Sequence, residues 1–383
     1  MAEYKKTGSC KVLVVTGCMA QRYKNEIIEE VPEVDAVLGT TSYGDILKAI
    51  REAMEGKHFQ EFKDIDYLPE KLGKRVLTTG GHFGYLKIAE GCDKHCTYCI
   101  IPKLRGKFRS VPMERLVTQA KEMAEEGVKE LILVAQETTV YGTDIYGKKS
   151  LHILLKELCK IKGIRWIRVL YCYPEEIYDE LIQTMKEEKK ICHYLDLPIQ
   201  HASDRILKRM GRRTTQAELV EIVNKLRREI PDIVLRTTLI SGFPGETQED
   251  HEELMSFVDE MEFDRLGVFT YSPEEDTPAA TMPDQVAEEV KEARRDEIME
   301  LQQEISYDKG TDRIGQELLV MIEGKVADES AYIGRTYGDA PKVDGYIFVQ
   351  TGELLMTGDF AKVRVTGALE YDLIGELADE YTE

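Results

Sequence analysis

Three cysteines in one short loop constrain this chain more than any other feature of its sequence. Cys92, Cys96 and Cys99 follow Gly91 with the spacing C-x3-C-x2-C, after the apolar run 85–88, which predicts a buried strand. Thiolates this close together can converge on one metal centre. A cubane iron–sulfur cluster ordinarily takes four thiolates, so three leave one iron with an open coordination position. The alternative is a zinc site with His95 or a distant cysteine as the fourth ligand.

The composition predicts a globular, cytoplasmic protein. The 383 residues suffice for two or three domains, and 42% are hydrophobic, which is enough for proper cores. No run approaches the roughly 18 apolar residues of a membrane span, and no signal peptide is recognisable, so no membrane partner is expected. Eight cysteines in such a chain indicate metal binding or catalysis rather than disulfides. We interpret Cys159, Cys172 and Cys192 as core residues.

Residues 1–75 predict a truncated α/β domain fragment followed by a linker. Strands are expected at 11–16 and 34–38 and helices at 21–30 and 43–55. The stretch 56–83 contains Pro69 and shows no helix or strand period, so it is interpreted as the linker. Cys18 follows the first strand, a position that often faces a ligand crevice in α/β sheets. The other interpretation of Cys18 is a buried thiol.

Residues 76–305 predict a parallel sheet built from six β–α units. Six units imply right-handed crossovers and an open, partial (βα)6 barrel, because a closed barrel needs eight strands. Active sites in such barrels lie at the carboxyl ends of the strands, and the cysteine loop follows the first strand. The expected strands are 85–89, 130–135, 165–171, 194–198, 233–240 and 265–271, and a long charged helix is expected at 285–307.

Other strand ends supply further candidates. Glu137 is interpreted either as a partner for an ammonium group or as a solvated loop acid, and His201 either as functional or as a hydrogen-bonded loop residue. The segment 242–245 lacks the GK[ST] ending of a phosphate loop and predicts a tight turn. Four basic residues beside the cysteine loop could dock a substrate or an electron carrier, or could balance an acidic surface. They are Lys103, Arg105, Lys107 and Arg109.

Residues 306–383 predict a small all-β barrel with strands at 318–322, 346–349, 360–365 and 371–374. The chain has a formal net charge of −20, and residues 311–383 hold 15 acidic against 6 basic residues, so 6 − 15 = −9. RNA is a polyanion that such a surface repels, whereas an acidic surface attracts a basic protein. A basic protein partner is therefore expected and RNA is disfavoured.

Longer stretches around these residues resemble the radical S-adenosylmethionine (SAM) methylthiotransferase family. They are TGCMAQRY, LKIAEGCDKHCTYCIIPKLRGKFRS, LVAQETTVYG, LPIQHASDRILKRMGRR, LRTTLISGFPGET and FTYSPEEDT. The resemblance covers nearly the whole chain and is most specific in the central domain. It implies that the terminal barrel is similar to a TRAM domain.

The resemblance also implies cofactors. Cys92, Cys96 and Cys99 would hold a radical SAM [4Fe-4S] cluster, and Tyr98, Glu137 and Arg212 match positions near SAM. Cys18 matches the last of three ligands of a second [4Fe-4S] cluster. The family's usual opening strand and its two other cysteines are not recognisable, so we expect the second cluster to be incomplete. No residue is assigned as the catalytic one.

Family members attach a methylthio group to an unactivated carbon, so the resemblance implies the same reaction here. The GKFRS stretch resembles the branch that modifies an aspartate of ribosomal protein S-twelve (uS12), and an electron donor of the reduced flavodoxin or ferredoxin type is implied. One alternative is a transfer RNA (adenosine) methylthiotransferase. The other is a radical SAM protein that has lost sulfur insertion and only binds its substrate.

Overall fold

The computed structural model describes residues 1–68 and 76–378, and these form two compact units. The amino-terminal unit comprises Met1–Val76, Glu90–His95 and Cys99–Arg109. The barrel unit comprises Leu77–Ala89, Cys96–Tyr98 and Ser110–Glu383. Each unit is described by itself.

The amino-terminal unit contains a three-stranded parallel sheet in the order β1-β2-β3, formed by Val14–Thr16, Ala36–Leu38 and Phe59–Glu61. The central strand β2 is buried along its whole length, as its sequence AVL predicts. Strand β3 lies in the stretch expected to be linker, so that expectation is wrong there. Three residues are too few to show an alternating pattern. Pro69 lies outside the described residues.

The helices of this unit are short. The helix expected at 21–30 is two helices, because the backbone at Lys24 turns to a positive φ of 43° between them. The elements are α1 (Glu3–Thr7), α2 (Cys18–Tyr23), α3 (Glu26–Glu30), η1 (Tyr43–Asp45), α4 (Ile46–Met54) and α5 (Ile101–Arg105). Strands β5 (Ala89–Glu90) and β6 (Arg109–Ser110) pair where the chain passes from one unit to the other.

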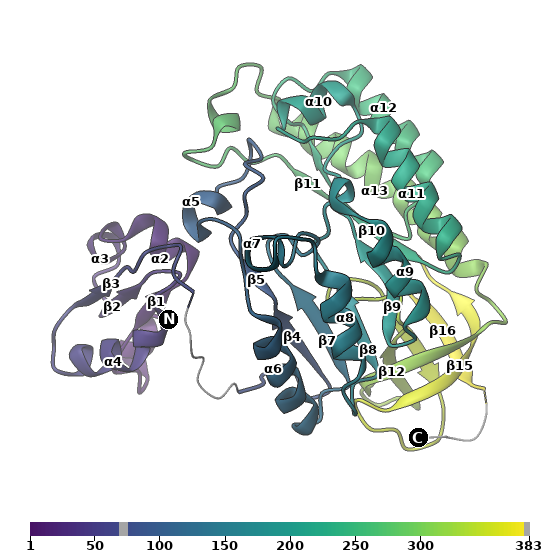
Figure 1. Cartoon of the computed structure of the whole chain (residues 1–383), viewed down its shortest axis with the longest axis horizontal. Helices are drawn as coiled ribbons and strands as arrows, with labels where there is room; N and C mark the ends of the chain where they lie inside the picture. The colour runs from purple at the N-terminus through teal and green to yellow at the C-terminus, as the bar shows by residue number, and fades with distance from the viewer. Residues whose placement is uncertain (69–75, 379–383) are drawn as a thin grey trace. The chain divides into compact units, whose positions relative to one another are not determined.

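The barrel unit contains the expected open sheet of six parallel strands, in the order β11-β10-β9-β8-β7-β4 (Figure 1). Five strands lie within about two residues of their expected positions. Strand β9 begins at Ile191, whereas the sequence analysis expected it to begin at Tyr194. The strands are β4 (Phe83–Lys87), β7 (Glu130–Val134), β8 (Trp166–Val169), β9 (Ile191–Asp196), β10 (Val234–Ser241) and β11 (Arg265–Thr270).

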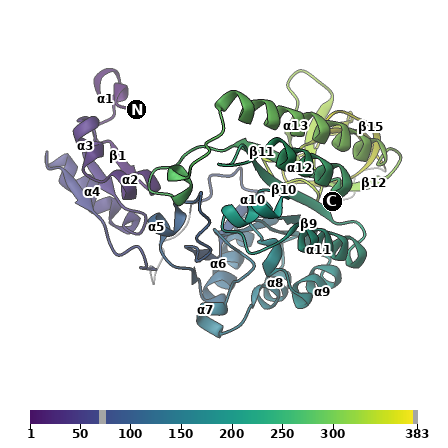
Figure 2. The same cartoon turned by 90° about the horizontal axis from the view of Figure 1, so that it is seen from above.

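Helices cover the outer face of this sheet (Figure 1). Thr247 and Asp250 form a capping box at the start of one of these helices, and Thr215 and Glu218 form a second one. Helix α13 runs beside β11, α12 and β15 (Figure 2). None of the helices in the described residues is both long and apolar enough to cross a membrane. The elements are α6 (Met113–Glu125), α7 (Thr143–Tyr146), α8 (Leu151–Cys159), η2 (Pro174–Glu176), α9 (Asp179–Glu187), α10 (Asp204–Arg209), α11 (Gln216–Glu229), α12 (Gln248–Met261), η3 (Pro278–Thr281) and α13 (Glu288–Thr311).

The carboxyl-terminal strands close into a five-stranded barrel in the order β12-β13-β14-β16-β15. The expected all-β barrel is confirmed, but β13 was not expected from the sequence. Its glycine and its terminal Arg335 obscure the alternation, yet Arg335 is fully buried. The strands are β12 (Glu317–Lys325), β13 (Ala331–Arg335), β14 (Ile347–Gln350), β15 (Phe360–Ala368) and β16 (Leu373–Leu377).

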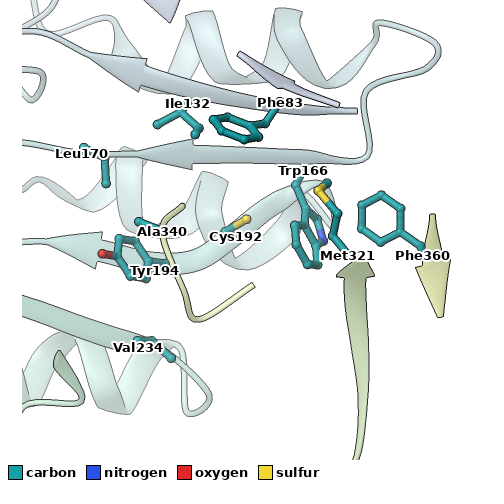
Figure 3. Packing of buried hydrophobic residues seen from close by; sticks show 10 residues of the cluster. All are labelled: Phe83, Ile132, Trp166, Leu170, Cys192, Tyr194, Val234, Met321, Ala340 and Phe360. Carbon is teal, nitrogen blue, oxygen red and sulfur yellow. The ribbon is translucent and has the colours of Figure 1, made fainter. Parts of the chain in front are cut away.

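The small barrel and the open sheet share one hydrophobic core (Figure 3). Met321 and Phe360 of the small barrel pack in the same cluster as Trp166, and the Trp166 and Phe360 rings meet edge to face at 4.8 Å. Glu130 on β7 accepts hydrogen bonds from Arg168 at 2.8 Å and Arg335 at 2.6 Å, and all three side chains are fully buried. A salt bridge therefore joins the sheet to the small barrel inside their common core.

Candidate functional site

The carboxyl ends of the six strands lie at one edge of the sheet, because all six are parallel. The cysteine loop follows β4, and the residues after β7, β8, β9 and β10 therefore lie at this edge too. Several sequence-predicted residues are among them. The two cysteines buried in the barrel unit away from the loop, Cys172 and Cys192, are core residues as expected, and burial raises the pKa of each to about 12.

The cysteine loop belongs to both units. Cys92 is buried in the amino-terminal unit, where its N–H donates to the Gly106 carbonyl at 3.2 Å. Gly91 has a positive φ of 78°, and a Cβ there would lie 2.0 Å from the Lys107 carbonyl oxygen, so only glycine fits. Cys99 of the same unit is partly exposed, while Cys96 belongs to the barrel unit. Within residues 1–68 and 76–378, no three His, Cys, Asp or Glu side chains stand together as a metal site.

Cys96 and Arg212 both contact Tyr173, a residue that the sequence analysis did not identify. The Cys96 Sγ lies 3.0 Å from the Tyr173 hydroxyl, and the Arg212 guanidinium lies over the Tyr173 ring at 4.1 Å from its centroid. Burial raises the pKa of Tyr173 above its ordinary range, so the phenol keeps its proton at neutral pH. Tyr173 lies in the segment that follows β8, which ends at Val169, so the strand-end rule used for Glu137 would have found it.

Arg212 is only partly satisfied by protein partners. Its Nη2 donates to Glu175 at 3.3 Å and to the Pro198 carbonyl at 3.2 Å, but its Nε and Nη1 are buried without a hydrogen-bond partner among the described residues. Burial disfavours the charge, yet the Glu175 carboxylate more than offsets this and the pKa of Arg212 is raised. Two nitrogen atoms of a permanent cation, which carry three N–H donors, are therefore available to an acceptor on a ligand.

Glu137 is buried, so its interpretation as a solvated loop acid is wrong. One of its oxygens accepts the Thr139 N–H at 2.8 Å, and the Thr139 hydroxyl accepts the Tyr173 N–H at 3.1 Å. The loops after β7 and β8 are thereby tied together. A buried carboxylate and a buried guanidinium are the complements of the amino and carboxylate groups of an amino-acid ligand.

Tyr98 lies on an apolar wall. It packs with the cluster of Ile206, Met210, Phe243, Tyr271 and Ala279, and its ring meets that of Phe243 at 6.4 Å. The segment 242–245 is the expected tight turn, in which the Glu246 carboxylate accepts the Gly242 N–H at 2.8 Å. His201 is the expected hydrogen-bonded loop residue: it is fully buried, and its Nδ1 accepts the Ser203 N–H at 3.0 Å.

Cys18 begins α2 in the amino-terminal unit, directly after Gly17. Arg105 donates from Nε to the Cys18 Sγ at 3.2 Å and pairs with Glu90 at 3.4 Å. Arg109 of the basic group pairs with Asp66 at 3.2 Å. Two of the four basic residues, Arg105 and Arg109, are thus paired with nearby carboxylates. This favours the interpretation that these two balance acidic groups rather than dock a partner. The Cys10 thiol donates to the nearby Val12 carbonyl at 3.5 Å.

Comparisons with known proteins agree with this arrangement. Residues 86–258 match the Radical SAM superfamily, and residues 314–378 match the TRAM domain. The chain is 65% identical over 375 residues to the ribosomal protein uS12 methylthiotransferase RimO of Lachnoclostridium phytofermentans, covering 98% of this chain and 85% of the relative. It is 53% identical to RimO of Clostridium perfringens, covering 99% and 85%.

Among solved structures, the cobalamin-dependent S-adenosylmethionine radical enzyme OxsB matches with a TM-score of 0.48 and 14% identity. That match covers 79% of this chain and 44% of the other.

Proposed function

The chain belongs to the RimO family of radical SAM methylthiotransferases, and on that premise we propose that it attaches a methylthio group to ribosomal protein uS12. The observation that carries this proposal is the 65% identity, over 98% of the chain, to a curated uS12 methylthiotransferase. We propose an aspartate side chain of uS12 as the acceptor, as the resemblance implies. We further propose three domains, 1–75, 76–305 and 306–383, in a protein that works in the cytoplasm, where ribosomes are made.

We propose that Cys92, Cys96 and Cys99 supply the thiolates for the radical SAM [4Fe-4S] cluster, in place of the zinc alternative. The chemistry of the donors fits, because thiolates are the usual ligands of such clusters. When bound, the cluster and SAM supply the radical chemistry of the superfamily. A reduced flavodoxin or ferredoxin is proposed as the electron source, and Cys18 as one ligand of the second cluster.

The chain's own residues bind and orient the cofactor in this proposal. Arg212 would receive the carboxylate of SAM on its Nε and Nη1, and Glu137 would receive the ammonium group. Tyr98 would contribute an apolar contact to SAM, because it packs with the apolar cluster described above. Tyr173 holds Cys96 and Arg212 in one layer, since it contacts both.

The acidic surface supports a protein substrate over the transfer RNA alternative. Ribosomal proteins are basic, and the charge of −9 on residues 311–383 favours their approach and opposes that of RNA.

We expect Arg212→Gln to raise the KM for SAM about 10- to 100-fold, because a charge-assisted hydrogen bond contributes about 1.5–3 kcal/mol. The matched control is Arg213→Gln, since the neighbouring Arg213 is exposed. Both variants should be assayed for 5′-deoxyadenosine formation across a range of SAM concentrations. Equal KM values in the two variants would remove Arg212 from the SAM site.

The proposed function is tested by mass spectrometry of uS12 and of transfer RNA from cells with and without this gene. We expect a methylthio group on uS12 that depends on the gene. A gene-dependent change on transfer RNA alone would establish the second branch instead. Binding of uS12 by the purified, cluster-loaded protein without SAM turnover would establish a protein that only binds its substrate.

A further inference from the structure

A cavity of about 350 Å³ lies where the open sheet meets the carboxyl-terminal barrel, within the barrel unit. One wall is the edge strand β11 with helix α13, and the other is formed by the barrel loops 343–346 and 371–372. Helix α13 packs against both β11 and β15, so the walls belong to one packed assembly (Figure 2). Its lining includes no residue of the cysteine loop and none of the residues proposed to hold SAM.

Two residues of the lining each have a buried oxygen atom with no hydrogen-bond partner in the part of the chain that the structure describes. The two atoms are Oε1 of Gln302 and Oγ of Ser306, whose residues are only 1% and 4% exposed. The orientation of Gln302 is fixed, because its amide nitrogen donates to the Phe263 carbonyl at 2.9 Å. Buried polar atoms are ordinarily hydrogen-bonded, so two unpaired oxygens on neighbouring turns of one helix indicate a ligand that donates hydrogen bonds.

The charges in the lining favour a cation. Three carboxylates line the cavity: Asp264, Asp344 and Asp372. Asp264 is 3.6 Å from Lys309, Asp344 accepts the Tyr194 hydroxyl at 2.7 Å, and Asp372 accepts the Tyr346 N–H at 2.7 Å.

The cations in the lining have carboxylate partners outside it. Arg236 pairs with Asp196 at 2.7 Å and Arg265 with Asp339 at 2.6 Å. Arg236 also lies 3.4 Å from Asp344. Asp196 and Asp339 neutralise the two arginines from outside the lining. The carboxylates of the lining therefore outnumber its uncompensated cations.

We propose that this cavity binds a basic side chain of the protein substrate, and that arginine fits it best. A guanidinium carries five N–H donors in a rigid plane and can satisfy acceptors in several directions, whereas an ammonium is a compact point charge. The assignment of the side chain to uS12 rests on the proposed function. The cavity would then fix the substrate at the junction of sheet and barrel while its target residue reaches the strand ends.

Gly267 offers a variant that fills the cavity. It lies in the lining on β11, and a Cβ there would meet nothing nearer than Arg236 Nη2 at 3.9 Å. Gly267→Val should therefore occupy the space without displacing the backbone. Gly324→Val is the matched control, because a Cβ at Gly324 on β12 would have no heavy atom within 4 Å and this glycine is outside the lining. Ser306→Ala removes one acceptor that has no protein partner to lose.

The test measures binding of Nα-acetyl-L-arginine amide by ligand-observed NMR, with the neutral citrulline analogue as the comparison probe, and binding of uS12 by calorimetry. We expect the wild-type and Gly324→Val proteins to bind the arginine probe in preference to the citrulline probe, and Gly267→Val to bind neither. Ser306→Ala should weaken arginine binding about tenfold, the loss expected for one hydrogen bond to a charged group. The uS12 dissociation constant should rise at least tenfold in Gly267→Val.

Equal binding of the arginine probe by the wild-type and Gly267→Val proteins, or by neither, would overturn the proposal. So would unchanged uS12 affinity in Gly267→Val. If the wild-type protein binds the arginine probe through this cavity but neither binds nor modifies uS12, the cavity is supported and the proposed function fails.

Discussion

Replacing Cys96 with alanine is expected to abolish the formation of 5′-deoxyadenosine from SAM. A site-differentiated cluster depends on three thiolates, and losing one removes a direct bond to iron. Cys92→Ala and Cys99→Ala should have the same effect. The measurement is anaerobic reconstitution followed by iron and sulfide analysis and by chromatography of the SAM cleavage products, with both readouts expected to fall.

Cys159→Ala is the matched control for these variants. Cys159 ends α8 away from the loop, and burial raises the pKa of its thiol to about 12, so it stays protonated at neutral pH. We expect this variant to retain its iron and its activity. Normal SAM cleavage in all three loop variants would refute the assignment of the cluster to this loop.

Replacing Glu130 with alanine is expected to lower the free energy of unfolding by about 3–5 kcal/mol, the cost of breaking a buried ion pair. The loss is large because Glu130 is the shared partner of two buried cations, Arg168 and Arg335. Removing the Glu130 carboxylate leaves the two buried guanidinium groups without the negative charge that they share. Urea denaturation at neutral pH measures the effect.

Glu317→Ala is the control, because Glu317 pairs with Arg364 on the surface, where both side chains are nearly half exposed. An exposed pair contributes about 0–1 kcal/mol, so this variant should be near neutral. Equal destabilisation by the two substitutions would contradict the structural role given to the buried pair.

The same salt bridge predicts how stability depends on pH. Burial alone would raise the pKa of Glu130, but Arg335 and Arg168 more than offset it and hold the pKa below the ordinary 4.5. The stabilisation is thus present above the ordinary value and is lost as the pH falls from there through the lowered pKa. Glu130→Gln should accordingly unfold with a weaker dependence on pH in the acid range.

Local sequence determined much of this protein. The C-x3-C-x2-C spacing and Gly91 define the loop, and six apolar runs at regular intervals predicted six parallel strands in an open sheet. The reason is that periodicity and turn chemistry depend on residues only a few positions apart. The tight turn at 242–245 and the capping box at Thr247 are likewise formed by residues only a few positions apart in the sequence.

Tertiary structure alone decided which polar residues are buried and what they contact. Arg335 ends a strand that was not expected from the sequence, and it lies in the core, where it pairs with Glu130, 205 residues earlier. Arg212 gained its ring contact and its carboxylate from Tyr173 and Glu175, on a loop after a different strand. The burial of the unpaired oxygens of Gln302 and Ser306 depends on the packing of α13 beside β11 and the small barrel. Burial and pairing of this kind depend on contacts between distant segments, and no local pattern encodes them.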